Sequence, residues 1–202
     1  MKIIGICGGS GSGKTTLVEA VREHLSTDFV SVISQDSYYK NHDTLTFKER
    51  CELNYDHPNA IDYDLLVSHL NQLKAGKSIH SPIYSYSEHL RSDQFIEVFP
   101  KPVVLVEGIL IFAHTPLREQ FTTTIFIDAE EDTRLSRRTV RDIQTRGRTT
   151  EGVKHRFEDT ILPMHNAHIQ PHKQTSDYIF DNNKDDLSRL GSFCKLVNKI
   201  IK

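Results

Sequence analysis

The feature that most constrains this chain is a glycine-rich segment, GGSGSGKT, at residues 8–15. A short apolar run at 2–7 precedes it and predicts a buried strand, and an amphipathic stretch from about Thr15 to Leu25 follows it and predicts a helix. The spacing fits G-x-x-x-x-G-K-[ST], in which backbone N–H groups and the first turn of a helix surround phosphate oxygens. The strand, the loop and the helix together predict a P-loop that holds a nucleoside triphosphate. An ordinary glycine turn is the alternative, and it does not explain why the match falls between a strand and a helix.

Each residue type in this loop has a role in binding phosphate or Mg²⁺. The glycines let backbone N–H groups point toward phosphate oxygens, Lys14 reaches the β- and γ-phosphates, and the Thr15 hydroxyl can coordinate Mg²⁺. The residues expected to bind ATP are Gly8, Gly9, Ser10, Gly11, Ser12, Gly13, Lys14, Thr15 and Thr16.

Apolar and amphipathic segments alternate along the rest of the chain. Strands are predicted at 29–33, 103–111, 124–128 and 178–180, and helices at 62–73, 131–145 and from Asp186 onward. This alternation predicts the α/β class, with a P-loop NTPase-type parallel sheet and helices on both faces. We expect a single P-loop kinase domain over residues 1–202, with two short strands over 79–100 that project from the sheet as a hairpin insert. Residues 37–60 are polar and are expected to be irregular.

Two acids stand where predicted strands end. Asp36 follows the second strand, and Glu107 follows the apolar run at 103–106. Ligands of parallel α/β sheets bind beyond the carboxyl ends of the strands, so both acids should lie near the P-loop. There Asp36 can accept a proton from an attacking hydroxyl or hold Mg²⁺, and Glu107 can bind Mg²⁺ together with Thr15. The alternatives are a helix cap at Asp36 and a loop salt bridge at Glu107.

Composition and charge exclude several partners. The formal net charge is −2 and the pI is about 6.6, which does not favour a nucleic acid. The residues at 134–148 are nevertheless rich in arginine, with Asp142 as the one acid, and this local excess indicates an anion site. No apolar stretch approaches the roughly 18 residues of a membrane span. Three separated cysteines, and a start that runs directly into the loop without a signal peptide, predict a cytoplasmic protein.

Taken in order, five stretches resemble the uridine kinase (uridine–cytidine kinase) family of P-loop nucleoside kinases. They are ISQDSYY at 33–39, NYDHPNAID at 54–62, PIYSYSEHLR at 82–91, VLVEGIL at 104–110 and DTRLSRRTVRDIQTRGR at 132–148. Many proteins share the P-loop alone, whereas this combination is specific to the family. The resemblance covers about residues 3–181. It implies that ATP, with Mg²⁺ as cofactor, phosphorylates uridine or cytidine at the 5′-hydroxyl, a reaction of pyrimidine salvage.

The resemblance also implies which residues act on the phosphoryl group. Asp36 is the expected general base on the ribose 5′-hydroxyl, and Lys14 is the expected catalytic cation of the P-loop. Arg141 and Arg146 are expected to come from a helical lid over the triphosphate, at about residues 139–156. Forked guanidinium donors suit the charge that develops on the transferred group, and a lid excludes water.

A second set of residues is expected to hold the nucleoside beneath the hairpin, which serves as a substrate cap. By resemblance, Asp56 and Arg138 hold the ribose hydroxyls, Tyr84 and His89 contact the pyrimidine, and Arg148 supports base recognition. Taken alone, an Arg-rich helix is more often a solvated face, and a lone histidine is more often a surface or structural residue.

The chain departs from the family pattern at two points. Arg156 stands where a glutamine usually follows the lid, which bears on the choice between uridine and cytidine. The segment at 181–184 replaces the usual Pro-Arg-Gly and bears on the base of the phosphate donor. The resemblance also implies a homotetramer.

Two other functions and one metal site have partial support in the sequence. A GTPase-like binding module is suggested by the NKDD at 183–186, but D-x-x-G is absent and the third strand ends in EGIL at 107–110. A sister kinase of the same architecture, acting on ribulose phosphate or pantothenate, would not account for the Tyr84–His89 pair. The histidines at 165, 168 and 172 have spacings that could suggest zinc, but Pro171 interrupts them and no acid or cysteine completes a set. We therefore interpret them as a solvated helix face.

Overall fold

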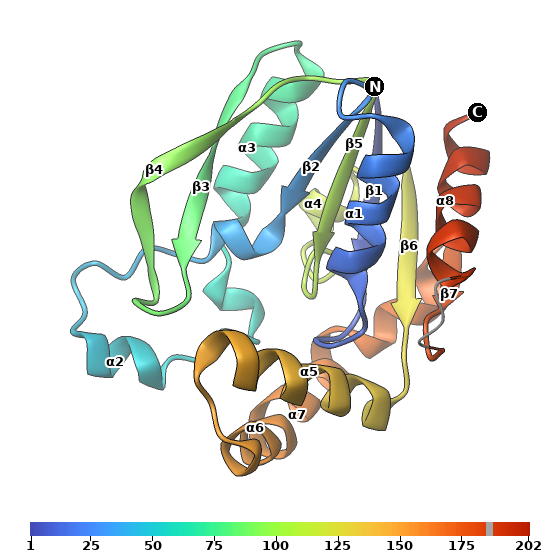
Figure 1. Ribbon diagram of the computed structural model, residues 1–202. Coiled ribbons are helices and arrows are strands. Elements are labelled where there is room, and N and C mark those ends of the chain that lie inside the picture. The colour runs from blue at the N-terminus through green and yellow to red at the C-terminus, as the bar shows by residue number, and fades with distance from the viewer. Residues whose placement is uncertain (185–187) are drawn as a thin grey trace.

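The computed structural model describes residues 1–184 and 188–202. Its centre is a five-stranded parallel sheet in the order β2-β5-β1-β6-β7 (Figure 1). The strands are β1 (Lys2–Cys7), β2 (Val30–Ser34), β5 (Val103–Gly108), β6 (Thr123–Asp128) and β7 (Tyr178–Asp181). The predicted α/β class is confirmed. The predicted strand at 103–111 is shorter than expected, because β5 ends at Gly108.

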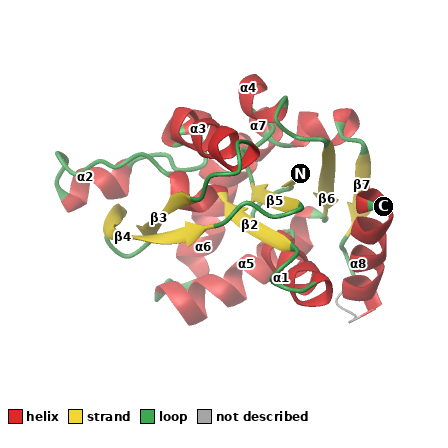
Figure 2. Ribbon diagram, turned by 90° about the horizontal axis from the view of Figure 1, so that it is seen from above, coloured by secondary structure: helices red, strands yellow, loops and turns green. Residues whose placement is uncertain are grey.

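Helices cover both faces of the sheet, as predicted (Figure 2). Successive side chains of a strand point to opposite faces, and β1 follows this rule. Ile3 packs in the apolar cluster that contains Leu66 of helix α3 (Tyr63–Lys74). Ile4 packs in the cluster that contains Val18 of α1 (Lys14–Leu25) and Val197 of α8 (Ser188–Ile201). Each fully buried aliphatic side chain contributes about 1.5–3 kcal/mol to folding. Two apolar layers therefore hold the sheet rigid beneath its carboxyl edge.

The α-helices include two short ones, at 47–52 and 115–118, that the sequence did not predict. They are α1 (Lys14–Leu25), α2 (Phe47–Glu52), α3 (Tyr63–Lys74), α4 (Thr115–Arg118), α5 (Glu131–Arg146), α6 (Thr150–Arg156), α7 (Leu162–His168) and α8 (Ser188–Ile201). Helix α2 lies in the segment that was predicted to be irregular, and a capping box between Thr46 and Glu49 begins it. The predicted helix start at Asp186 lies outside the described residues. No helix in the described part of the chain is long and apolar enough to cross a membrane.

Residues 79–98 form a separate antiparallel pair, β3 (Ile79–Ser85) and β4 (Leu90–Val98). The ladder has an irregularity between Pro82 and Tyr84. The hairpin turn, α2 and α5 all lie at the end of the molecule where the parallel strands finish (Figure 1). The fold thus gathers segments that are far apart in sequence around the carboxyl edge of the sheet.

Candidate active site

A cavity of about 430 Å³ opens at this edge, and it is lined by segments from the P-loop to α6 and by Arg189 of α8. It brings together most of the residues that the sequence predicted: Ser10, Gly11, Gly13, Lys14, Thr15, Thr16, Asp36, Asp56, Tyr84, His89, Glu107, Arg138, Arg141, Arg146 and Arg148. The predicted Gly8, Gly9 and Ser12 belong to the same loop but lie outside the described lining of the cavity. Predicted groups that are spread from residue 10 to residue 148 of the chain therefore line one cavity.

Arg134 and Asn182 pack closely against the backbone of the P-loop. A Cβ atom on Gly11 would lie 2.2 Å from the Arg134 carbonyl oxygen, and one on Gly13 would lie 2.5 Å from Asn182 Nδ2. Both glycines also have left-handed backbones, with φ of 81° and 87°. Asn182 Nδ2 donates to the Ser12 carbonyl at 2.6 Å. Glycine is therefore required at both positions by conformation and by packing.

The loop lysine is inside the cavity and bound to the loop itself. Lys14 Nζ donates to the carbonyl oxygens of Gly8 and Gly9 at 2.9 and 3.2 Å. Burial lowers the pKa of Lys14, and the Glu107 carboxylate opposes this shift. An ammonium group that is held by neutral carbonyls can exchange them for phosphate oxygens.

The two predicted carboxylates stand opposite the P-loop. Asp36 lies in the 3₁₀ turn Gln35–Tyr38, directly after β2, and Glu107 lies in β5 beside Ser34, whose hydroxyl donates to Glu107 Oε1 at 2.8 Å. Burial raises the pKa of Glu107, and Lys14 lowers it. With the Thr15 hydroxyl, these groups form an all-oxygen donor set that fits Mg²⁺, which takes one or two carboxylates and completes its shell with water and phosphates.

Aromatic rings line the other end of the cavity. His89, in the hairpin turn, stacks on Tyr55 with ring centroids 4.9 Å apart and an interplanar angle of 16°, and Tyr84 packs on Tyr39 at 5.0 Å. Burial lowers the pKa of His89, and the positive charges of Arg156 and Arg148 lower it further. A neutral imidazole has one donor and one acceptor nitrogen. The aromatic end of the cavity therefore offers flat rings for stacking and a side chain that can both donate and accept a hydrogen bond.

Asp56 lies between this aromatic end and the arginines. Its carboxyl group is buried, and burial raises its pKa, while the charges of Arg138 and Arg156 oppose that shift. Arg138 Nη1 donates to Ser10 Oγ of the P-loop at 2.6 Å. The predicted Asp56 and Arg138 are thus neighbours in the space between the loop and the rings.

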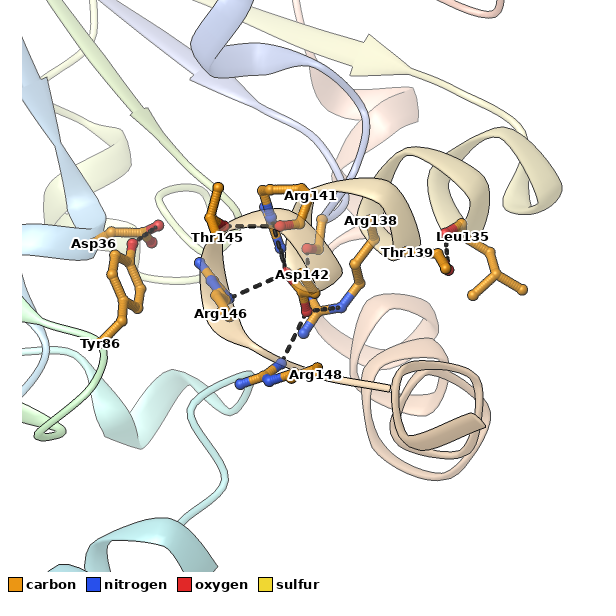
Figure 3. Close-up of polar contacts among 11 residues, drawn as sticks. Asp36, Tyr86, Leu135, Arg138, Thr139, Arg141, Asp142, Thr145, Arg146 and Arg148 are labelled. Atoms are coloured by element: carbon orange, nitrogen blue, oxygen red, sulfur yellow. Dashed lines mark hydrogen bonds and ion pairs between the residues drawn. The ribbon is translucent and has the colours of Figure 1, made fainter. Parts of the chain in front are cut away.

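One carboxylate holds the arginines of α5 and of the turn after it. Asp142 is fully buried and accepts from Arg141 Nη2 at 2.8 Å and from Arg148 Nη1 at 2.9 Å (Figure 3). It also pairs with Arg138 at 3.4 Å and with Arg146 at 3.6 Å. Helix α5 ends at Arg146, and the left-handed backbone of the next residue, Gly147, turns the chain toward α6. Four predicted cations therefore share one anchor at the cavity wall.

Sequence reasoning missed several of these groups. In the sequence Asp142 stands out only as the single acid among arginines, and its i+4 spacing to Arg138 and Arg146 is the available signal. Tyr86 and Tyr55, inside two of the family-like stretches, were given no role. Asn182 holds the P-loop from the end of β7, and no local pattern marks it.

The interpretation of the three histidines was partly wrong. His165 is buried behind the P-loop rather than solvated, with Nε2 3.0 Å from Gln170 Oε1. Burial and the nearby Arg134 lower the pKa of His165 to about 4. A Cβ atom on Gly9 would lie 2.8 Å from its Nδ1 atom. The histidine side chain therefore forms part of the wall that supports the loop.

The fold and the site define a P-loop phosphotransferase of the α/β class. The family model described as "Phosphoribulokinase / Uridine kinase family" matches residues 3–188, and the chain belongs to this family. The chain is 44% identical over 177 residues to a uridine kinase of Clostridium novyi (strain NT), which covers 88% of this chain and 85% of that protein. It is 46% identical over 177 residues to a uridine kinase of Macrococcus caseolyticus (strain JCSC5402), with 88% and 86% covered.

Solved structures share the fold at low sequence identity. A possible uridine kinase from Bacillus stearothermophilus superposes with a TM-score of 0.60 at 20% identity, covering 89% of this chain and 88% of that one. A putative fructose transport system kinase from Silicibacter sp. TM1040 gives 0.71 at 18% identity, with 88% of each chain covered. These similarities confirm the predicted P-loop architecture.

Proposed function

We propose that this protein transfers the γ-phosphoryl group of ATP to the 5′-hydroxyl of uridine or cytidine, giving the nucleoside 5′-monophosphate for pyrimidine salvage. The observation that carries the proposal is the single cavity in which a P-loop lysine, a strand-end carboxylate and stacked aromatic rings face one another. The two relatives are both named uridine kinase, which supports a pyrimidine nucleoside as the acceptor. A sister kinase is not favoured. The NKDD motif behind the GTPase alternative extends over Asp185 and Asp186, outside the described residues.

The chain's residues then have the following roles. Asp36 accepts the proton of the attacking hydroxyl. Lys14, Arg141 and Arg146 stabilise charge on the transferred group. Mg²⁺, when bound, would neutralise the β- and γ-phosphate oxygens, and Thr15, Glu107 and Asp36 would hold it.

The nucleoside is oriented by the far end of the cavity. Asp56 and Arg138 bind the ribose hydroxyls, and Tyr84 and His89 bind the pyrimidine. Arg148 supports the base side of the cavity. The predicted homotetramer and the cytoplasmic location stay predictions.

A panel of acceptors tests the proposal. The protein, ATP and Mg²⁺ are incubated with uridine, cytidine, ribulose 5-phosphate or pantothenate, and ADP and the phosphorylated product are both measured. We expect product only with the two nucleosides. The proposal would be overturned if ribulose 5-phosphate or pantothenate were phosphorylated and the two nucleosides were not. It would also be overturned by slow GTP hydrolysis without any phosphorylated acceptor.

Replacing His89 by alanine tests the acceptor end. We expect the KM for the nucleoside to rise about ten-fold or more, because a ring that stacks on Tyr55 and carries two hydrogen-bonding nitrogens is lost. The KM for ATP should change little. His24, exposed on α1, provides the control variant His24→Ala. Equal effects of His89→Ala on both substrates would contradict a role in acceptor recognition.

Hydrogen exchange tests the lid over about 139–156. This segment has the Gly147 turn between two helices and an exposed outer surface, features of a low-stability unit. We expect ATP and uridine together to slow exchange in α6 and the Gly147 turn, while α3 serves as an internal reference. Identical exchange in the lid with and without the ligands would argue against closure.

A further inference from the structure

The proposed general base already has a hydroxyl donor. Tyr86 Oη donates to Asp36 Oδ2 at 2.6 Å, and both side chains line the cavity (Figure 3). Tyr86 comes from the hairpin turn and Asp36 from the 3₁₀ turn directly after β2, so the contact joins the insert to the edge of the main sheet. A hydrogen bond of this length to a carboxylate is a charge-assisted one.

The attacking alcohol needs the same position. To lose its proton to Asp36, the acceptor hydroxyl must donate a hydrogen bond to that carboxylate. A phenol and a primary alcohol offer the same O–H donor, and a phenol with an ordinary pKa of about 10 keeps its proton throughout the physiological pH range.

We propose that Tyr86 is a placeholder for the acceptor: its hydroxyl occupies the hydrogen-bonding position on Asp36 in the ligand-free enzyme, and the acceptor's hydroxyl displaces it. This proposal rests on the proposed function, in which Asp36 receives the proton of the acceptor. It makes Tyr86 a positioning residue that keeps the carboxylate oriented until the acceptor arrives.

The surroundings of Tyr86 suit a group that moves. Its side chain is 42% exposed, and it lies in the turn 86–89, which the main sheet does not hold. His89, at the other end of the turn, has a left-handed backbone with φ of 52°. A nucleoside that contacts His89 and Asp36 together therefore acts on both ends of one short turn.

Displacement of Tyr86 would also affect Arg146, one of the arginines that pair with Asp142. The Arg146 guanidinium lies over the Tyr86 ring at 4.4 Å from its centroid, and 3.6 Å from Asp142. When the ring leaves, Arg146 loses a cation–π contact and is freer to turn toward the triphosphate. The geometry thus links arrival of the acceptor to the cation expected at the γ-phosphate.

Tyr86→Phe tests the placeholder, because it removes the hydroxyl and keeps the ring beneath Arg146. Binding of uridine and of 5′-deoxyuridine is measured by calorimetry without ATP. We expect uridine to bind about three- to ten-fold more tightly to the variant, since it no longer displaces an internal donor. Binding of 5′-deoxyuridine, which has no hydroxyl to place on Asp36, should stay within two-fold, about the measurement error. Tyr178→Phe, on the exposed edge of β7, is the control and should leave both constants unchanged.

Two outcomes would overturn the placeholder. Weaker binding of both nucleosides to Tyr86→Phe would mean that the phenol is part of the pocket wall. An unchanged dissociation constant with a lower kcat would mean that the phenol stays on the base during reaction. A failed proposed function would look different, because wild-type protein would not bind uridine at all; the comparison would then use the acceptor that the panel identifies.

Discussion

Asp36→Asn is expected to lower kcat by about 10² or more while ATP still binds, which is the range for loss of a general base. Asparagine keeps the shape of the side chain, and its carbonyl oxygen can still accept the hydrogen bond from Tyr86 that Asp36 accepts now. What it loses is the ability to take the proton of the attacking hydroxyl. Turnover is measured at saturating ATP and uridine, and ATP affinity is measured separately by calorimetry.

The same residue is also expected to contribute to Mg²⁺ binding, so the experiment must separate the two roles. If Asp36 acts mainly through the metal, raising Mg²⁺ should restore turnover in the variant. If it acts as the base, turnover should stay low at every Mg²⁺ concentration. Asp93→Asn, exposed on β4, is the matched control. Near-normal kcat in Asp36→Asn would remove it as the base.

The sequence predicted the parts of the site that follow from local rules. Asp36 and Glu107 each follow an apolar run, and parallel strands bring such positions to one edge. The P-loop is similarly local, because its motif, its strand and its helix are consecutive. These residues could be placed together before any tertiary contact was known.

The residues that were missed depend on contacts between distant segments. Asn182 reaches the P-loop across a sequence separation of 170, and Tyr86 reaches Asp36 across 50. Neither contact leaves a pattern in the neighbouring sequence. Helix α2 was missed for another reason: it is short and exposed, so its capping box was the available signal. The burial of His165 likewise depends on where α7 packs and not on its spacing to other histidines.

The second large effect is expected at Asp142, which the sequence reasoning left without a role. Asp142→Asn should lower kcat/KM for ATP by about 10², because Arg141 and Arg146 would lose the carboxylate that positions them. Loss of one preorganised hydrogen-bond donor to the charge that develops in the transition state lowers the rate by about this factor. The change keeps the volume of a fully buried side chain, so a packing defect is not introduced. Asp132→Asn, exposed in the first turn of α5, is the control.

Stability as a function of pH shows whether the charge of Asp142 is what matters. Burial raises the pKa of this carboxyl, but Arg138, Arg141 and Arg146 outweigh burial and bring it below its ordinary value of 3.8. A depressed pKa stabilises the folded state above the unfolded pKa, and this contribution is lost as pH falls through the folded pKa. The difference in unfolding free energy between wild type and Asp142→Asn should therefore be constant from about pH 8 to 5 and should shrink below about pH 4. Urea denaturation across this range measures it. A difference that does not depend on pH, together with unchanged ATP kinetics, would show that the four arginines hold their positions without the carboxylate.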